Sequence, residues 1–314
     1  MSAEFWNAAC YKFVALDEKG LKKKKQDVLR ACINNGLKGT ITLSKEGINI
    51  NLCGVKENIK AGFSDLNKLS DFSNLTPKIT VSSWIPFRKM RVKIRSELIP
   101  GNSHIKEKSI GEGKYISPKE LHECFVRKEK VFLLDTRNTY ETAVGKFKDA
   151  IIPNIRTFQD FPKWLANNLS DKKEHKIITY CTGGIRCEKA VLQMEEMGFQ
   201  KVYQLSGGIL NYFNEVTSKN YQTQKEFYDG ECFVFDSRIA LDRKLKVSKL
   251  DVCYRCWEIL SSEEIKNSTY KGQNHCFKCY DIMMNKEKKT QEKQLKSHQE
   301  KWDRSKKMRA LHRL

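Results

Sequence analysis

The chain has 314 residues, of which 58 are Lys or Arg and 38 are Asp or Glu, giving a formal net charge of +20. This length allows two or three domains, and the lack of any run of about 18 apolar residues argues against a membrane span. The chain has eleven cysteines, and an odd number argues against complete pairing in disulfides. The first residues lack the segments of a signal peptide. Both features favour a cytoplasmic, reducing compartment. The excess of positive charge predicts a polyanionic partner, with nucleic acid the first candidate.

The first third of the chain, residues 1–95, predicts a ferredoxin-like βαββαβ domain. Apolar periodicity places its elements, in order, at 10–16 (strand), 19–35 (helix), 39–43 and 47–52 (strands), 56–69 (helix) and 89–95 (strand). Such an order packs an antiparallel sheet on two helices. No catalytic set is visible in this region, so we interpret the domain as a platform for RNA.

The last of these strands carries a row of positive charge. Alternation along it places Met90, Val92 and Ile94 toward the core. The opposite face then presents four basic side chains, which suit a phosphate backbone and exceed what edge protection needs: Lys89, Arg91, Lys93 and Arg95. Trp84 and Phe87 precede the strand and could stack on bases, although packing in the core is the simpler role for each.

Residues 96–113 predict a linker to a central α/β domain over 114–222, because Gly and Pro interrupt any periodic pattern there. Three apolar runs in the central domain, 131–134, 176–180 and 201–205, are separated by segments long enough for crossover helices. This is the pattern of a parallel sheet that is buried on both faces.

The helix that follows the second of these runs should be amphipathic. Its apolar stripe is expected to pack on the sheet and consists of Ala190, Val191, Met194 and Met197. Its polar residues Glu188, Lys189 and Glu195 are expected to face water.

Residues 180–187, Tyr-Cys-Thr-Gly-Gly-Ile-Arg-Cys, are the most informative segment of the chain. Cys181 follows an apolar strand and precedes a glycine-bearing loop and a helix. In such a loop the backbone N–H groups converge on the sulfur and, with the helix N-terminus and Arg186, favour the thiolate. We therefore expect a catalytic nucleophile, Cys181, in an active-site loop of Thr182, Gly183, Gly184, Ile185 and Cys187. A buried free cysteine beside a tight turn is the simpler alternative.

The spacing C-x4-R resembles the short loop of rhodanese-type sulfurtransferases, whereas their phosphatase relatives have one residue more. Another predicted strand ends in Asp135 and Arg137, and the carboxyl ends of parallel strands meet at one edge of a sheet. We expect these two residues to join the catalytic site by orienting the loop or adding positive potential. A structural salt bridge at the strand end is the alternative for Asp135. The turn at 205–208 should line the same rim.

Four cysteines near the C-terminus form two pairs of the type C-x2-C. Cys253 and Cys256 are separated from Cys276 and Cys279 by a span typical of two knuckles that share one tetrahedral zinc ion. We expect a small structural zinc element over 223–285, with two reduced dithiols as the alternative. The following segment, 286–314, is rich in Lys and Arg and predicts a basic tail that either binds polyanions or aids solubility.

Several motifs occur in the order seen in the bacterial rhodanese-domain tRNA uridine(34) hydroxylases, the TrhO family. They lie at 45–49, 88–93, 134–138, 181–190, 205–210 and 230–236, and the resemblance runs from about residue 8 to 285. It implies oxygen-dependent hydroxylation of the wobble uridine of tRNA at carbon 5, with molecular oxygen as cosubstrate and Cys181 at the family's active position. No flavin, haem or nicotinamide is expected, and the 6 histidines show no pattern of iron ligands.

The residues leave three functions open. A tRNA hydroxylase explains the loop, the cationic strand and the cysteine pairs together, a thiosulfate or persulfide sulfurtransferase explains only the loop, and a non-catalytic RNA-binding module leaves the loop without a purpose. For a hydroxylase, Cys181 could add to carbon 6 of uracil, carry a persulfide, or be oxidised to a sulfenic acid that Cys187 resolves. The sequence does not determine the oligomeric state.

Overall fold

The computed structural model describes residues 4–101, 114–217, 227–253, 256, 258–260, 262–266, 276, 279–282 and 284–285. The second part of the predicted linker and the predicted basic tail lie outside these residues. The chain divides into two compact units, Met1–Lys249 and Leu250–Leu314, and each is treated by itself. Within the described ranges, every helix is too short or too polar to span a bilayer.

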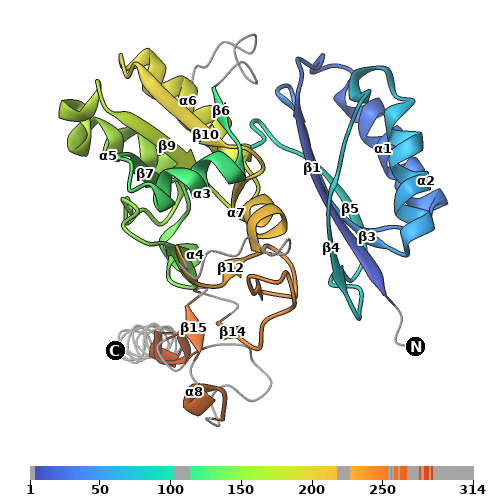
Figure 1. Cartoon of the computed structure of the whole chain (residues 1–314). Coiled ribbons are helices and arrows are strands. Elements are labelled where there is room, and N and C mark those ends of the chain that lie inside the picture. Colours follow the sequence, from blue (N-terminus) through green and yellow to red (C-terminus); the bar gives the residue numbers. More distant parts are fainter. Residues whose placement is uncertain are drawn as a thin grey trace, which may run out of the picture. The chain divides into compact units, whose positions relative to one another are not determined.

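The N-terminal domain is a five-stranded sheet with two helices on one face (Figure 1). The strand order is β4-β1-β3-β2-β5. In chain order the elements are β1 (Phe5–Phe13), α1 (Leu21–Asn34), β2 (Lys38–Ser44), β3 (Gly47–Gly54), α2 (Lys56–Asn67), the 3-10 helix η1 (Ser70–Phe72), β4 (Lys78–Ser82) and β5 (Met90–Ile94). The predicted class, an α/β domain with two helices on a sheet, is confirmed.

The prediction for the fourth strand of this domain is wrong. β4 takes that position and pairs antiparallel with β1, while the basic segment forms a fifth strand at the opposite edge. This fifth strand, β5, runs parallel to β2, so the sheet is not wholly antiparallel. Periodicity did not single out β4 because a five-residue edge strand with only Ile79 and Val81 as apolar side chains gives a weak alternating signal.

The two faces of the sheet differ in chemistry because strand residues alternate. Ile41, Ile50 and Val92 share one register row and lie in the core cluster. Ile94, which was expected in the core, is 37% exposed near the end of the edge strand. The other face carries two rows of mostly polar side chains, namely Arg91, Thr40, Asn51, Ala9 and Lys78 in one row and Lys93, Thr42, Asn49 and Tyr11 in the next.

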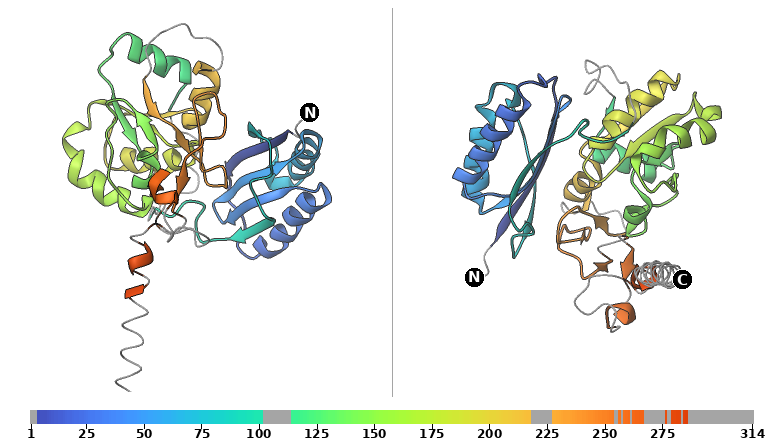
Figure 2. Two further views of the ribbon diagram at one scale, coloured as in Figure 1. Left: turned by 90° about the horizontal axis from the view of Figure 1, so that it is seen from below. Right: turned by 180° about the vertical axis from the view of Figure 1, so that it is seen from behind.

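The central domain is built on a four-stranded parallel sheet in the order β6-β10-β9-β7. Its elements are β6 (Tyr115–Ile116), α3 (Pro118–Val126), β7 (Phe132–Asp135), α4 (Thr139–Thr142), β8 (Gly145–Phe147), η3 (Phe158–Asp160), α5 (Phe161–Asn168), η4 (Ser170–Lys172), β9 (Lys176–Tyr180), α6 (Ile185–Glu196), β10 (Lys201–Leu205), α7 (Gly208–Tyr212) and η5 (Phe213–Thr217). Ile177 and Val202 pack in a cluster with residues of α5 and α6, and Ile178 packs in a second cluster with residues of α3 and α7. The sheet is therefore covered on both faces, as expected (Figure 2).

Ala190, Val191 and Met194 of the predicted apolar stripe are buried as expected, whereas Met197, just after the end of α6, is half-buried. Two polar residues of α6 contradict the prediction, because Glu188 and Lys189 are only 4% and 1% exposed, whereas Glu195 faces water. Hydrogen-bond partners from segments distant in the sequence surround both buried residues. The periodicity of a single helix cannot reveal such partners.

The residues after the central domain return to it. β11 (Tyr228–Gly230) pairs with β8, and β12 (Cys232–Phe233) pairs with β13 (Ala240–Leu241). The second compact unit begins at Leu250 and contains β14 (Asp251–Val252), β15 (Ile259–Leu260) and α8 (Ser262–Lys266). The domain boundaries expected from the sequence stay a prediction.

Candidate active site

Cys181 lies between the end of β9 and the start of α6, in the loop that the sequence predicts. Gly184 has a φ of 104°, which side-chain-bearing residues rarely adopt, and its N–H lies 3.0 Å from the Cys181 sulfur. A Cβ atom at Gly184 would also come within 2.9 Å of the Tyr11 hydroxyl. The loop therefore wraps the sulfur closely, and this turn requires glycine.

The surroundings of the sulfur favour its charged form. Burial alone raises the pKa of the Cys181 thiol. A hydrogen bond from Cys187, the charge of Arg186 and backbone N–H groups of the loop outweigh burial, so this pKa lies well below its usual range. Burial, together with the hydrogen bond and charge of Cys181, raises the pKa of Cys187. These opposite shifts of the two pKa values favour a thiolate at Cys181 and a protonated thiol at Cys187.

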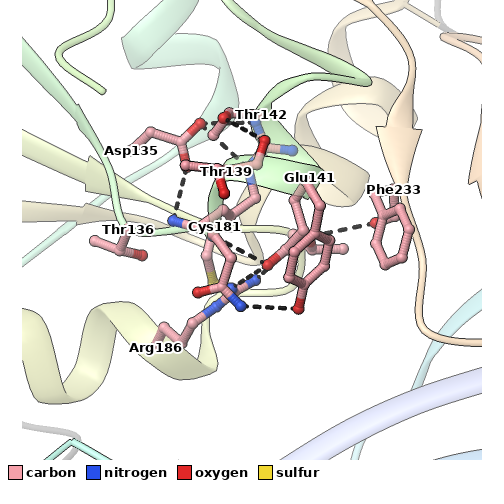
Figure 3. A network of polar contacts seen from close by, with 12 residues as sticks. Asp135, Thr136, Thr139, Glu141, Thr142, Cys181, Arg186 and Phe233 are labelled. Carbon is pink, nitrogen blue, oxygen red and sulfur yellow. Dashed lines mark hydrogen bonds and ion pairs between the residues drawn. The ribbon is translucent and has the colours of Figure 1, made fainter. Parts of the chain in front are cut away.

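Arg186 does not act on the sulfur as an unpaired charge. Its guanidinium binds the Glu141 carboxylate through two contacts, Nη1–Oε2 at 2.5 Å and Nη2–Oε1 at 2.7 Å (Figure 3). Glu141 is fully buried and also accepts from the N–H of Asn138 and the hydroxyl of Thr182. Sequence reasoning missed Glu141, whose only signal is its spacing from Asn138, typical of a capping box.

The turn at 205–208 was expected to line the rim, but the residues of this segment that line the cavity containing Cys181 are Leu210 and Asn211, which come just after the turn. The turn and the start of α7 pack against the loop instead. The N–H of Ile209 donates to the Cys181 carbonyl at 3.0 Å, and the N–H of Leu210 donates to the Thr182 carbonyl at 3.2 Å. Gly208 has a φ of 66°, and a Cβ there would lie 2.4 Å from the Cys181 carbonyl oxygen. This close backbone approach fixes the loop from outside.

Asp135 and Arg137 bind each other and are both buried at the end of β7. The Arg137 guanidinium contacts both carboxylate oxygens at 2.7–3.2 Å and also donates to the Gly145 carbonyl. In the described part of the chain, neither residue lines the cavity that contains Cys181. This geometry favours the structural salt bridge over a direct catalytic role.

A cavity of about 1150 Å³ lies in front of the loop and is lined by residues of both domains. Ligand pockets usually measure about 300–1,000 Å³, so this cavity has room for a nucleotide. Phe235 and Tyr115 line it and are 56% and 47% exposed. Cys181 also lines it but has 0% exposed surface, so a substrate reaches the sulfur only after the atoms that cover it move.

The N-terminal domain brings two side chains to this cavity. The Tyr11 hydroxyl donates to Glu188 at 2.9 Å, and the Lys78 ammonium donates to the Gly183 carbonyl at 2.9 Å. Glu188 also accepts from Tyr115 and from the side-chain amide of β10 residue Gln204. Sequence reasoning missed all of these residues, because each acts through a partner that is distant along the chain.

Lys189 joins the two domains from the buried side of α6. Its ammonium contacts the carboxylates of Glu46 at 2.8 Å and Glu97 at 2.9 Å and the carbonyl of Ile99 at 2.7 Å. Glu46 accepts in addition from the N–H of Leu98. A lysine placed between two carboxylates explains why it is buried rather than solvated.

In the basic row, Arg91 and Lys93 lie on the polar face of the N-terminal sheet, and Lys89 and Arg95 flank β5 on either side. All four side chains of the row are exposed, as the alternation predicts: Lys89, Arg91, Lys93 and Arg95. Trp84 is 42% exposed, so the expectation of a core position is wrong for it. Phe87 is half-buried and lines the cavity. Nothing in the alternation of a single strand could tell these two aromatic residues apart.

The four C-terminal cysteines come together within the second compact unit. The sulfur atoms of Cys253, Cys256, Cys276 and Cys279 all lie within 4.8 Å of one another, a group that could hold a metal ion. The N–H of Cys276 also donates to the Cys253 sulfur at 3.2 Å. These cysteines form the small core of this unit together with Leu260.

Comparison with known proteins defines the class of each domain. Residues 5–98 match the UPF0176 acylphosphatase-like domain, and residues 117–215 match the rhodanese-like domain. The chain is thus a rhodanese-domain protein with an acylphosphatase-like domain in front.

Relatives that share both domains define the family. A tRNA uridine(34) hydroxylase of Legionella pneumophila (strain Corby) is 42% identical over 238 residues, which cover 76% of this chain and 91% of the relative. Those of Wolbachia pipientis subsp. Culex pipiens (strain wPip) and Sinorhizobium medicae (strain WSM419) are 39% and 35% identical, covering 85% of this chain and 91% and 82% of the relatives. The chain belongs to the family of the tRNA uridine(34) hydroxylases.

Proposed function

We propose that this protein hydroxylates uridine 34 of tRNA at carbon 5 in the cytoplasm, with molecular oxygen as cosubstrate. The observation that carries the proposal is a cysteine sulfur that accepts the Gly184 N–H at 3.0 Å beside a cavity with room for a nucleotide, in a chain that belongs to this family. The lowered pKa of the Cys181 thiol agrees with this role. A base in the anticodon loop can leave its stack at modest cost and enter such a cavity.

Within this proposal Cys181 is the nucleophile. The loop N–H groups hold its charge, and Cys187 donates a hydrogen bond to it. Arg186, paired with Glu141, positions the loop. Phe235 and Tyr115, exposed at the cavity, offer faces on which a base could stack.

We place the RNA backbone along the basic row of β5. Arg91 shares a register row with Lys78, and Lys93 shares the next row with Tyr11. An RNA strand that crosses the sheet along these rows would pass from the exposed cations to the cavity. Salt dependence is measured as the slope of the logarithm of the tRNA binding constant against the logarithm of the salt concentration. Replacing Arg91 and Lys93 by Gln should make this slope less steep by about one unit for each phosphate contact that is lost. An unchanged slope would count against this path.

For the cysteine cluster we propose one structural zinc ion per chain. Four thiolates at a Zn–S distance of about 2.3 Å lie about 3.8 Å apart in a tetrahedron, and the sulfurs of Cys256 and Cys276 are 3.8 Å apart. The ion would supply stability that so small a unit cannot obtain from apolar burial. Metal analysis of chelator-free protein should find one zinc per chain, and protein without zinc would overturn the assignment.

The function is tested by nucleoside analysis of tRNA from bacteria that lack their own enzyme of this family. Complementation with the wild-type chain should restore 5-hydroxyuridine, and Cys181→Ala should not. Cys124→Ala is the matched control, because this cysteine is also buried but lies on α3 outside the cavity. Restoration by Cys181→Ala would refute the proposal, and thiocyanate release from thiosulfate at a rate indifferent to tRNA would favour a sulfurtransferase.

A further inference from the structure

We propose that Lys78, from the N-terminal domain, is a catalytic residue that binds the uracil carbonyl oxygen on which negative charge develops when Cys181 attacks the ring. The proposal rests on the proposed function and extends it to the part played by the first domain.

Lys78 reaches the active-site loop directly. It stands on β4, and its ammonium lies 2.9 Å from the carbonyl oxygen of Gly183, two residues after Cys181. It lines the same cavity as Cys181, and it lies over the ring of Tyr11 at 5.8 Å from the ring centroid. An ammonium has three donor protons, so two remain for a ligand beside the bond to Gly183.

Lys78 also differs from the other cations that line the cavity. Arg186 is paired with Glu141 at 2.5 Å, and Arg238 is paired with Asp236 at 2.6 Å. Among the described residues, no carboxylate lies within 4.0 Å of the Lys78 ammonium, and its hydrogen-bond partner is a carbonyl oxygen. Its charge therefore has no carboxylate partner at a half-buried position, where a charge interacts more strongly with a developing anion than it does in water.

The groups around this ammonium favour its charged form and oppose the effect of burial. Tyr11 and Cys10 approach from β1, and Cys181, Cys187 and Glu188 approach from the loop and α6. The carboxylate of Glu188 already accepts hydrogen bonds from Tyr11, Tyr115 and Gln204. The ammonium is thus the donor that a substrate carbonyl would meet.

The step that Lys78 serves is reversible and needs no oxidant. The Cys181 thiolate forms a bond to carbon 6 of uracil, and the electron pair of the C5=C6 bond moves onto carbon 5 and the oxygen at carbon 4. The ammonium donates a hydrogen bond to that oxygen. Water then protonates carbon 5, and loss of one of the two hydrogens at carbon 5 followed by expulsion of the thiolate restores uracil. In D2O the net result is exchange of the hydrogen at carbon 5 for deuterium.

This exchange gives a test that is independent of oxygen. The full-length protein is incubated anaerobically in D2O with tRNA from cells that lack the enzyme, and deuterium in the anticodon fragment is measured by mass spectrometry. Removing one oxyanion donor usually costs about 100-fold or more in rate. We therefore expect Lys78→Gln to slow exchange at saturating tRNA by about that factor while tRNA affinity changes little. Lys78→Arg, which keeps the charge, should recover part of the rate.

Lys23→Gln is the matched control, because it removes one charge from an exposed position of α1. Its exchange rate should equal that of the wild type. Thermal unfolding of each variant checks that the fold is kept. Exchange by Lys78→Gln within threefold of the wild type would overturn the proposal, as would a loss explained wholly by weaker tRNA binding.

The wild-type protein separates this inference from the proposed function. Hydroxylation in cells without any exchange in D2O would overturn the role of Lys78 in ring attack and leave the proposed function standing. Neither hydroxylation nor exchange would overturn both. Exchange that depends on both Cys181 and Lys78 supports the proposal.

Discussion

Replacing Glu141 by Gln should destabilise the protein strongly, because Glu141 is the hidden partner of the active-site loop. Its carboxylate binds the Arg186 guanidinium at 2.5 and 2.7 Å and accepts two further hydrogen bonds. The two side chains are 0% and 8% exposed, so water cannot replace the missing partner. The substitution replaces one carboxylate oxygen of Glu141 by an amide NH2 group, which cannot accept a hydrogen bond. It also leaves the charge of the Arg186 guanidinium without its partner.

The expected cost follows from the burial of the pair. Removing one member of a buried ion pair typically costs about 3–5 kcal/mol, because the other charge stays desolvated. The pair lies in the compact unit Met1–Lys249. For a unit of about this size, each kcal/mol changes the melting temperature by about 2–4 °C, so the melting temperature should fall by roughly 6–20 °C. The loop should also loosen around Cys181, so hydroxylation should fall more than the folded fraction does.

The measurement is urea unfolding followed by intrinsic fluorescence, with Glu123→Gln as the control. Glu123 also pairs with an arginine, Arg127 at 3.1 Å, but the two side chains are 49% and 66% exposed. An exposed pair of this kind contributes about 0–0.5 kcal/mol. If Glu141→Gln lies within 1 kcal/mol of Glu123→Gln, the Arg186–Glu141 pair does not hold the loop and the reasoning fails.

Three further outcomes are expected. Gly208→Ala should lower stability by more than about 2 kcal/mol in urea unfolding because of its positive φ and the 2.4 Å approach to the Cys181 carbonyl. Gly183→Ala, with nothing within 4 Å of the added atom, should be nearly neutral, and equal effects would contradict this account. The pKa of Cys181 is lowered in the folded protein, so its thiolate should persist at pH values below the usual thiol pKa of about 8.5. The thiolate is measured as the part of the 240 nm absorbance that Cys181→Ser removes, and this part should vanish as the pH falls through the folded pKa. A signal that appears only at higher pH would refute the thiolate. Lys189→Met removes the cation that pairs with Glu46 and Glu97, so the free energy of unfolding measured in urea should fall by about 3 kcal/mol or more. A loss below 1 kcal/mol would show that these contacts do not stabilise the protein.

Several features of the site could be predicted because they depend on neighbours in the sequence. A cysteine after an apolar strand, followed by glycines and a helix, sets the loop around Cys181 through backbone geometry alone. The alternation along β5 likewise predicted that Arg91 and Lys93 share one face, and both lie in the polar register rows of the sheet. The roles of Asp135 and Arg137 could not be fixed in this way, because only the packing of the strand end determines whether their charges meet each other or the cavity.

The sequence by itself determined the class of the two larger domains and the family, and it predicted the reactive sulfur, since all of these depend on periodicity and on local motifs. The tertiary structure decided which charges remain available at the sulfur. It buried Glu141 against Arg186, drew Glu188 and Lys189 of α6 into contacts with other segments, and brought Lys78 from β4 to the loop. Burial and pairing arise from segments that are far apart along the chain, and the strength of a charge depends on both. This is why no local pattern could have distinguished the neutralised arginine from the available lysine.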